Sequence, residues 1–188
     1  MVDEKQMMHG QHYRGQNLRG WFATEKFRGC RAYWDGRDLW SRGGHRVELP
    51  SPWRAGLPDG FPLDCEGWVG RGVAGGVEEC EAIQAITRSK FTDRIRLLIH
   101  DAPAVLSGWL DRMRAASAVL NSANDLVRSM GFVVIESTRQ AGQILGEVHA
   151  QGGEGLMLRE PHAAYRPGRH ATLVKLKRPY YATFLGVA

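Results

Sequence analysis

With 188 residues, 43% of them hydrophobic and 24% charged, the chain has the composition of a globular domain, which excludes collagen-like, low-complexity and wholly disordered proteins. Its net charge of +5 favours a polyanionic partner, because lysine and arginine neutralise phosphates and release counterions. No apolar run approaches the ~18 residues that a membrane helix needs, and the polar, acidic start is unlike a signal peptide, so we expect a cytoplasmic protein that binds no membrane.

The first half of the chain is predicted to contain mainly strands. Residues 1–18 are polar and lack periodicity, so we expect a loosely ordered lead-in there. The pair Asp35-Gly36 separates two extended runs and predicts a β-hairpin. Three extended runs are expected as strands in this half: residues 30–34, 39–41 and 61–66.

Helical spacing becomes prominent in the second half. Val77, Cys80, Ile83 and Ile86 recur at three-residue intervals and predict a helix that ends near Phe91. Strands are then expected over residues 95–100, 132–135, 154–159 and 172–177. Two further helices are expected: one from 104 toward 130, continuous or broken near 121, and one that begins at a capping box of Ser137 and Gln140. This order of elements predicts an α+β domain with antiparallel sheets flanked by helices.

Lysine is scarce, since only five of the 25 basic residues are lysines. Arginine cannot lose its proton in a protein, whereas a lysine can be tuned into an amine nucleophile. Lys26 falls at a loop-to-strand junction, where it can face a pocket. Lys175 and Lys177 share one face of an extended strand, and so do Asp64 and Glu66. A solvated sheet face explains either pair alone, but together the two pairs favour a polar cleft.

Six short stretches follow one another along the chain: Lys26-Phe-Arg-Gly-Cys-Arg31, Ser41-Arg42-Gly43-Gly44, Asp64-Cys65-Glu66, Ile99-His100-Asp101, Glu154-Gly-Leu-Met-Leu-Arg159 and Lys175-Leu-Lys177. In this order they resemble the motifs of the covalent nucleotidyltransferases, the superfamily of ATP-dependent DNA ligases, RNA ligases and mRNA capping enzymes. The surroundings of Arg31 and Trp68 look most like small bacterial and phage ATP-dependent DNA ligases.

The resemblance implies a domain organisation. Residues 19–180 would form the adenylation (nucleotidyltransferase) domain, with an ATP-grasp-like α+β fold. Residues 181–188 look like the first strand of a truncated OB-fold domain, the second domain of such ligases.

The resemblance also implies a reaction. Lys26 would attack the α-phosphate of ATP and hold AMP as lysyl-AMP, and AMP would pass to the 5′-phosphate of a nick so that a phosphodiester bond forms. Lys175 and Lys177 would act in catalysis by neutralising the triphosphate. Glu66 and Glu154 would contact the ribose and hold a divalent metal, Mg²⁺ or Mn²⁺.

Further binding residues follow from the same resemblance. The nucleotide-binding set comprises Thr24, Glu25, Arg31, Glu66, His100, Glu154 and Arg159. His100 takes the place of the aromatic residue that the family puts against adenine. Arg42 and Arg46 are expected to bind the phosphate side of a nick. The expected partner is nicked duplex DNA, and the protein is expected to be a monomer.

Two positions depart from the family pattern. Arg28 stands where the family has an aspartate, which reverses a charge beside Lys26, and Cys65 replaces the glycine of the Asp-Gly-Glu element. An RNA ligase and a non-catalytic module that binds nicks or duplexes therefore remain as alternatives.

Overall fold

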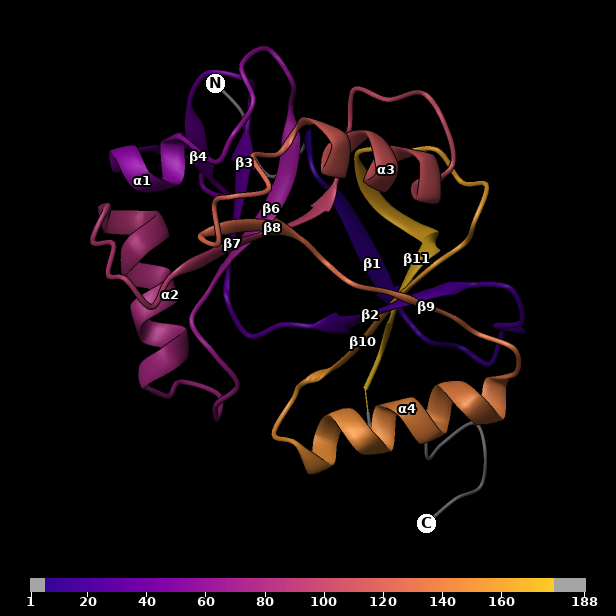
Figure 1. The fold of residues 1–188 in the computed structure, drawn as a ribbon. Helices are drawn as coiled ribbons and strands as arrows, with labels where there is room; N and C mark the ends of the chain where they lie inside the picture. Colours follow the sequence, from indigo (N-terminus) through magenta and orange to yellow (C-terminus); the bar gives the residue numbers. More distant parts are fainter. Residues whose placement is uncertain (1–5, 178–188) are drawn as a thin grey trace.

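Two β-sheets and four helices make up residues 6–177, the part of the chain that the computed structural model describes (Figure 1). The first sheet consists, in spatial order, of β1 (Met8–His12), β11 (Gly168–Leu176), β10 (Gly155–Arg159), β2 (Phe22–Lys26) and β9 (Val133–Val134). The second sheet consists of β5 (Arg46–Val47), β4 (Leu39–Ser41), β3 (Cys30–Trp34), β6 (Leu63–Trp68), β7 (Arg96–Asp101) and β8 (Val127–Ser129). The helices are α1 (Ser51–Arg54), α2 (Val77–Arg88), α3 (Trp109–Val119) and α4 (Thr138–Ala150).

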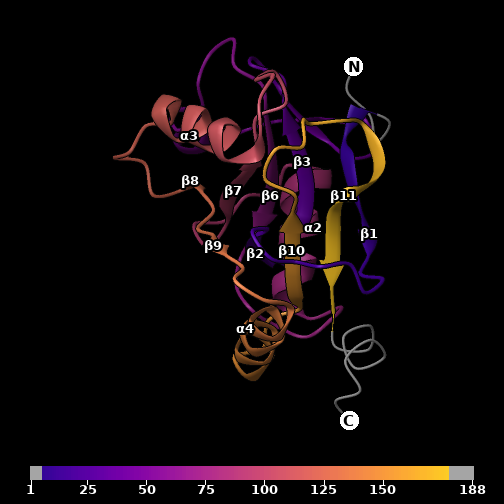
Figure 2. The same cartoon turned by 90° about the vertical axis from the view of Figure 1, so that its right-hand side faces the viewer.

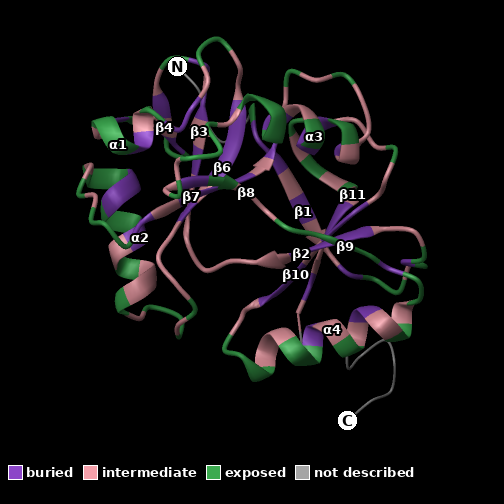
Figure 3. Cartoon of the chain, viewed as in Figure 1, coloured by how far each residue is buried: buried purple, intermediate pink, exposed green. Residues whose placement is uncertain are grey.

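The first sheet is covered by α4 (Figure 2). Ala141 and Leu145 of α4 are buried in the same apolar cluster as Leu156 of β10. The predicted helix start is confirmed, because the Ser137 hydroxyl accepts a hydrogen bond from the backbone N–H of Gln140 at 3.1 Å. Buried positions concentrate on the strands and on the inward face of this helix (Figure 3).

The second sheet has a separate apolar core, which α2 and α3 complete. Ile86 of α2 and Ala116 of α3 are buried there together with Trp34 of β3. A smaller cluster connects α3 to the first sheet: the rings of Phe22 and Trp109 lie 5.5 Å apart between their centroids. The two sheets are thus two packed units joined by aromatic rings.

The hairpin between β3 and β4 is confirmed. One carboxylate oxygen of Asp35 accepts hydrogen bonds from the backbone N–H groups of Arg37 and Asp38, at 2.8 and 2.7 Å. Gly36 has a φ of 98°, in the region that glycine adopts without a steric penalty. The other predicted strands and the helix from Val77 are also present, with small shifts of their bounds.

The expectation of a loosely ordered lead-in over residues 1–18 is wrong for residues 8–12. They form β1, which pairs in parallel with β11 at the edge of the first sheet. Met8 and Gly10 are the buried positions of this strand. Because the strand has only two inward positions and one of them is a glycine, its sequence shows no apolar periodicity. The domain expected to begin at residue 19 therefore includes this earlier strand.

Of the helix expected from 104 toward 130, only α3 from Trp109 to Val119 forms. It ends close to the break allowed near 121, but the helix expected beyond that break is wrong. The Asn121 side chain accepts a hydrogen bond from the N–H of Ala123, and the Asn124 side chain accepts one from Leu126. Asparagine side chains that bond nearby backbone groups compete with helical bonds. The chain then enters β8, which runs parallel to β7.

Two other expectations concern membranes and the end of the chain. None of the helices within residues 6–177 is long and apolar enough to cross a membrane. The expected start of an OB-fold domain at 181–188 lies outside the described residues.

Candidate active site

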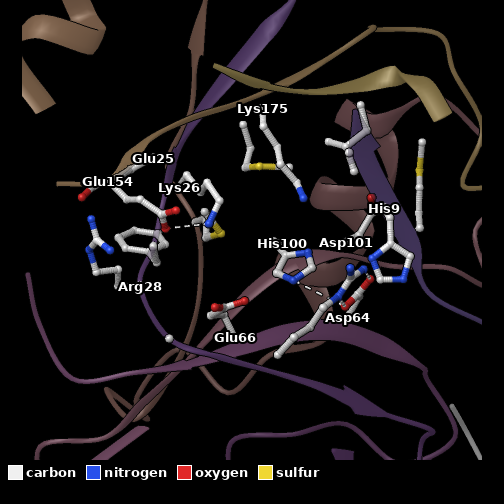
Figure 4. A pocket seen from close by; sticks show the side chains of 18 of the residues that line it. His9, Glu25, Lys26, Arg28, Asp64, Glu66, His100, Asp101, Glu154 and Lys175 are labelled. Carbon is white, nitrogen blue, oxygen red and sulfur yellow. Dashed lines mark hydrogen bonds and ion pairs between the residues drawn. The ribbon is translucent and has the colours of Figure 1, made fainter. Parts of the chain in front are cut away.

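A cavity of about 430 Å³ is lined by residues from both sheets (Figure 4). β1, β2, β10 and β11 contribute from the first sheet, and β3, β6 and β7 from the second. Its volume falls within the ~300–1,000 Å³ typical of small-molecule sites. The charged lining residues are Lys26, Arg28, Arg31, Arg42, Arg159 and Lys175, with Glu25, Asp64, Glu66, Glu79, Asp101 and Glu154.

Lys26 ends β2 and directs its amine into this cavity, bound to Glu154. The two side chains are 2.6 Å apart between Nζ and Oε2. They meet because β2 and β10 are antiparallel neighbours with Gly155 opposite Lys26. Lys177 donates to the other oxygen of the same carboxylate. Burial favours the neutral acid, but the bonds from Lys177 and Lys26 lower the pKa of Glu154 overall, so this carboxylate is ionised.

Lys175 lies on β11 and faces the cavity near Lys26 (Figure 4). Burial lowers the pKa of Lys175, and the neighbouring charges of Lys26, Arg169 and Lys177 lower it further. The structure thus places Lys26 and Lys175 in the cavity lining, with Lys177 bound to Glu154 beside them.

Asp64 anchors the wall that the second sheet provides. Arg31 donates to both of its oxygens, with Nε at 2.9 Å from Oδ1. The Tyr165 hydroxyl donates at 2.7 Å, and Nε2 of His100 lies 3.4 Å from Oδ1. Burial would raise the pKa of Asp64, but Arg31 and His100 bring it down to about 2. Asp64 is therefore charged and fixes Arg31 in the cavity wall.

Glu66 follows on the same face of β6 but behaves differently. Burial raises the pKa of its carboxyl group to about 7, against the opposing charges of Lys26 and Arg31. This carboxyl group therefore changes its protonation near neutral pH.

His100 presents a neutral ring to the cavity at pH 7, because burial lowers its pKa to about 4. Its carbonyl accepts a hydrogen bond from the Trp109 indole at 3.0 Å. Arg159 places its guanidinium carbon 4.8 Å from the centroid of the Trp109 ring. Burial lowers the pKa of Arg159 to about 10, so it stays charged at neutral pH.

That Thr24 binds the nucleotide stays a prediction. Thr24 is 2% exposed and does not line the cavity. Its hydroxyl accepts a hydrogen bond from Nη1 of Arg159 at 2.9 Å. Thr24 thus supports Arg159, which lines the cavity.

The other predicted binding residues differ in position. Glu25 and Arg42 line the cavity. Glu25 is held by Arg71, which donates to both of its oxygens at 2.9 and 2.7 Å. Arg46 lies on β5 outside the cavity lining and donates to Asp38 at 2.9 Å. That Arg46 binds a nicked partner stays a prediction.

Tyr165 and His9 were missed by the sequence analysis. Besides its bond to Asp64, the Tyr165 hydroxyl accepts a hydrogen bond from the backbone N–H of Met8 at 2.9 Å, so it connects β1 to the cavity wall. His9 of β1 lines the cavity. Neither residue belongs to a motif, and only the long-range pairing of β1 reveals them.

Cys65, one of the two departures from the family pattern, does not crowd the cavity. Its side chain is fully buried in the core of the second sheet, and its Sγ donates to the Ala32 carbonyl at 3.4 Å. The strand alternation that points Asp64 and Glu66 into the cavity points Cys65 away from it.

Two carboxylates, Glu66 and Glu154, are predicted to hold a divalent metal. In the described part of the chain, no group of three or more His, Cys, Asp or Glu residues is placed to hold a metal ion. Mg²⁺ at nucleotide sites uses one or two carboxylates together with phosphate oxygens and water. Lysines occupy both oxygens of Glu154, so Glu66 is the more open donor. The donor set fits a metal that arrives with a phosphate group.

Comparison with known proteins places the chain among related sequences and folds. No protein-family model matches it. It is 28% identical over 169 residues to a DNA ligase of Haemophilus influenzae, a match that covers 88% of this chain and 60% of the relative's length. Among solved structures it is similar to a Lig E DNA ligase, with 25% identity and a TM-score of 0.79 over 95% of this chain and 70% of the other.

Two viral structures share the fold. The Chlorella virus DNA ligase-adenylate has 19% identity and a TM-score of 0.70, over 92% of this chain and 67% of that one. The ATP-dependent DNA ligase of bacteriophage T7 has 16% identity and a TM-score of 0.67, over 92% and 68%. The family resemblance read from the motifs and the α+β class are both confirmed.

Proposed function

From the fold and ordered motifs that this chain shares with ATP-dependent DNA ligases, we propose that it is an adenylation domain of such a ligase. It binds ATP, forms lysyl-AMP on Lys26, and transfers AMP to the 5′-phosphate of a nick in duplex DNA. The observation that carries this proposal is the Lys26 amine, held by Glu154 inside a cavity that Lys175 also faces.

The first step is a displacement at the α-phosphorus. A bond forms between Nζ of Lys26 and phosphorus, the bridging Pα–O bond breaks, and pyrophosphate leaves with the electron pair. Oε2 of Glu154, 2.6 Å from the amine, is placed to receive the proton that nitrogen loses. Lys175, with its lowered pKa, offers positive charge to the phosphate oxygens as negative charge moves onto the leaving group.

The nucleoside half of ATP would occupy the part of the cavity around His100. A neutral imidazole ring can stack against a base without adding charge. Arg31, fixed by Asp64, and Glu66 supply polar partners for ribose and phosphate. Mg²⁺ or Mn²⁺, when bound through Glu66 and phosphate oxygens, would polarise the phosphate as a Lewis acid.

The second step needs a phosphate-bearing partner. The net charge of +5 suits nucleic acid, and Arg42 at the cavity supplies a guanidinium that can bind a 5′-phosphate. We propose nicked duplex DNA as that partner and a monomer as the acting form. The rate of joining at a nick with deoxyribose on both sides, compared with the rate at a nick flanked by ribose, distinguishes a DNA ligase from an RNA ligase.

Lysyl-AMP formation is the test of this proposal. With Mg²⁺ and ATP labelled at the α-phosphorus, label is expected on the polypeptide, and Lys26→Ala is expected to abolish it. Lys26→Arg, which keeps the charge but not the nucleophile, should also stay unlabelled. Lys90→Ala, at an exposed lysine outside the cavity, is the matched control and should label like the wild type. Label that persists in Lys26→Ala, or none on folded wild type with either metal, would overturn the proposal.

A further inference from the structure

We propose that Arg28 binds the pyrophosphate portion of ATP and holds it as it leaves. The inference rests on the proposed function, because it assigns one end of the same cavity. It concerns the position where this chain has an arginine in place of the family's aspartate, so the residue's role does not follow from the resemblance.

Arg28 lies at the right place in the cavity. It lines the cavity two residues after Lys26, in the loop between β2 and β3. In Figure 4 it lies on the side of Lys26 away from His100. An ATP molecule whose base lies at His100 and whose α-phosphate lies at Lys26 therefore extends its remaining phosphates toward Arg28.

The loop that carries Arg28 is tightly packed. A Cβ atom on Gly29 would overlap the Gly67 carbonyl oxygen and would lie 2.8 Å from Cγ of Glu66. Phe27, on the other side of Arg28, packs its ring on Trp68 with centroids 4.9 Å apart. Contacts on both sides thus hold the Arg28 backbone against β6.

Arg28 has no partner within the part of the chain that the structure describes. No hydrogen bond or ion pair there involves its guanidinium, and its Nε is buried without an acceptor. A partly buried charge without a counter-charge is unfavourable. An incoming anion would remove that penalty.

Three acidic residues of the cavity lining, Glu25, Glu154 and Glu79, are already engaged. Arg71 occupies both oxygens of Glu25, and lysines occupy both oxygens of Glu154. Glu79 accepts a hydrogen bond from the backbone N–H of Gly75. Arg28 is thus available to a ligand, and a guanidinium suits phosphate oxygens through paired hydrogen bonds.

The contact between Arg28 and pyrophosphate can be measured through the reverse of the first step. Inorganic pyrophosphate added to the lysyl-AMP form attacks phosphorus, re-forms the Pα–O bond, breaks the N–P bond and releases ATP. Arg28→Ala is expected to raise the pyrophosphate concentration for half-maximal reversal about tenfold, the loss of ~1.4 kcal/mol. Arg28→Asp should raise it further, because a carboxylate repels the anion. Arg88→Ala, at an exposed arginine of α2, is the control.

Two comparisons separate this role from others. AMP, which lacks the leaving group, should bind Arg28→Ala and wild type within about twofold, given the spread of such measurements. Weakened AMP binding would mean a merely structural role and would overturn the proposal. An unchanged response to pyrophosphate with slower AMP transfer to nicked DNA would also overturn it, because Arg28 would then serve the 5′-phosphate.

Failure of the proposed function can be distinguished from failure of this inference. Inorganic tripolyphosphate is titrated calorimetrically into the unmodified protein, a measurement that needs no lysyl-AMP. Weaker binding to Arg28→Ala than to wild type supports the anion site even if no label forms on Lys26. Equal binding to both overturns it.

Discussion

Asp64 and Glu66 share one face of β6 yet differ widely in acidity. The pKa of Asp64 is about 2 and that of Glu66 about 7. Asp64 receives hydrogen bonds from Arg31 and Tyr165, whereas burial dominates at Glu66. At neutral pH one carboxyl group is charged and the other titrates, a pairing typical of sites where two acids have separate tasks.

Glu66 gives the stability of the ligand-free protein a pH dependence. Its pKa is raised on folding from 4.5 to about 7, so the folded state holds the proton more tightly, and stability falls as pH rises through this window. The loss is at most ~3 kcal/mol. Glu66→Gln should remove this loss. The free energy of unfolding of the variant, measured with urea, should therefore rise relative to that of the wild type between pH 5 and pH 8.

The exposed residue Glu136 provides the control for that experiment. Glu136→Gln replaces a carboxyl group on the surface and is measured at the same two pH values. A Glu66→Gln variant that differs from wild type by the same amount at pH 5 and pH 8 would contradict the prediction.

A substitution in the loop between β2 and β3 tests how closely this loop must pack against β6. Gly29→Ala would push a methyl group onto Gly67 and Glu66 of β6, so we expect a loss of ~1–3 kcal/mol in urea unfolding and slower labelling of Lys26. Gly146→Ala is the matched control, since nothing lies within 4 Å of a Cβ there and alanine favours a helix by ~1 kcal/mol. Equal effects of both substitutions would show that the loop has room to adjust.

The elements could be predicted where local patterns are strong. Val77 and Ile86 mark α2 by helical spacing, and Asp35-Gly36 marks the β3–β4 turn by its chemistry. β1 could not be predicted, because its pairing with β11 joins residues far apart in the chain. A break near residue 121 was among the expectations, but the absence of helix after it could not be predicted, because the Asn121 and Asn124 side chains bind nearby backbone groups.

The candidate site could be predicted to the extent that motifs carry it. Lys26, Glu154 and Lys177, far apart in sequence, meet in one ion-paired group. Tyr165 could not be foreseen, because its role depends on where a loop places its hydroxyl. The burial of Thr24 and its bond to Arg159 could not be foreseen either, because alternation places Thr24 and Lys26 on one strand face without showing which side chains cover it.

The molecule as a whole depends on the junction between its two cores. Trp109 is fully buried and contacts Phe22, Phe132 and Arg159. Trp109→Ala should destabilise the protein by ~3–5 kcal/mol and weaken ATP binding, because Arg159 and His100 both contact the indole.

Urea unfolding and ATP titration measure those two effects. Leu106→Ala, at a side chain that is 96% exposed, should stay within ~0.5 kcal/mol of wild type. A Trp109→Ala variant of normal stability would show that the two cores stand independently.

The parallel pairing of β1 with β11 also orders events during biosynthesis. The ribosome makes β1 early, but β11, the strand with which β1 pairs, is made only after nearly all other described elements. Lys175 belongs to that late strand, and His9 reaches the cavity through its partner. Under the proposed function, a nascent chain would carry Lys26 long before it could bind a nucleotide, and formation of lysyl-AMP would wait for translation to pass Leu176.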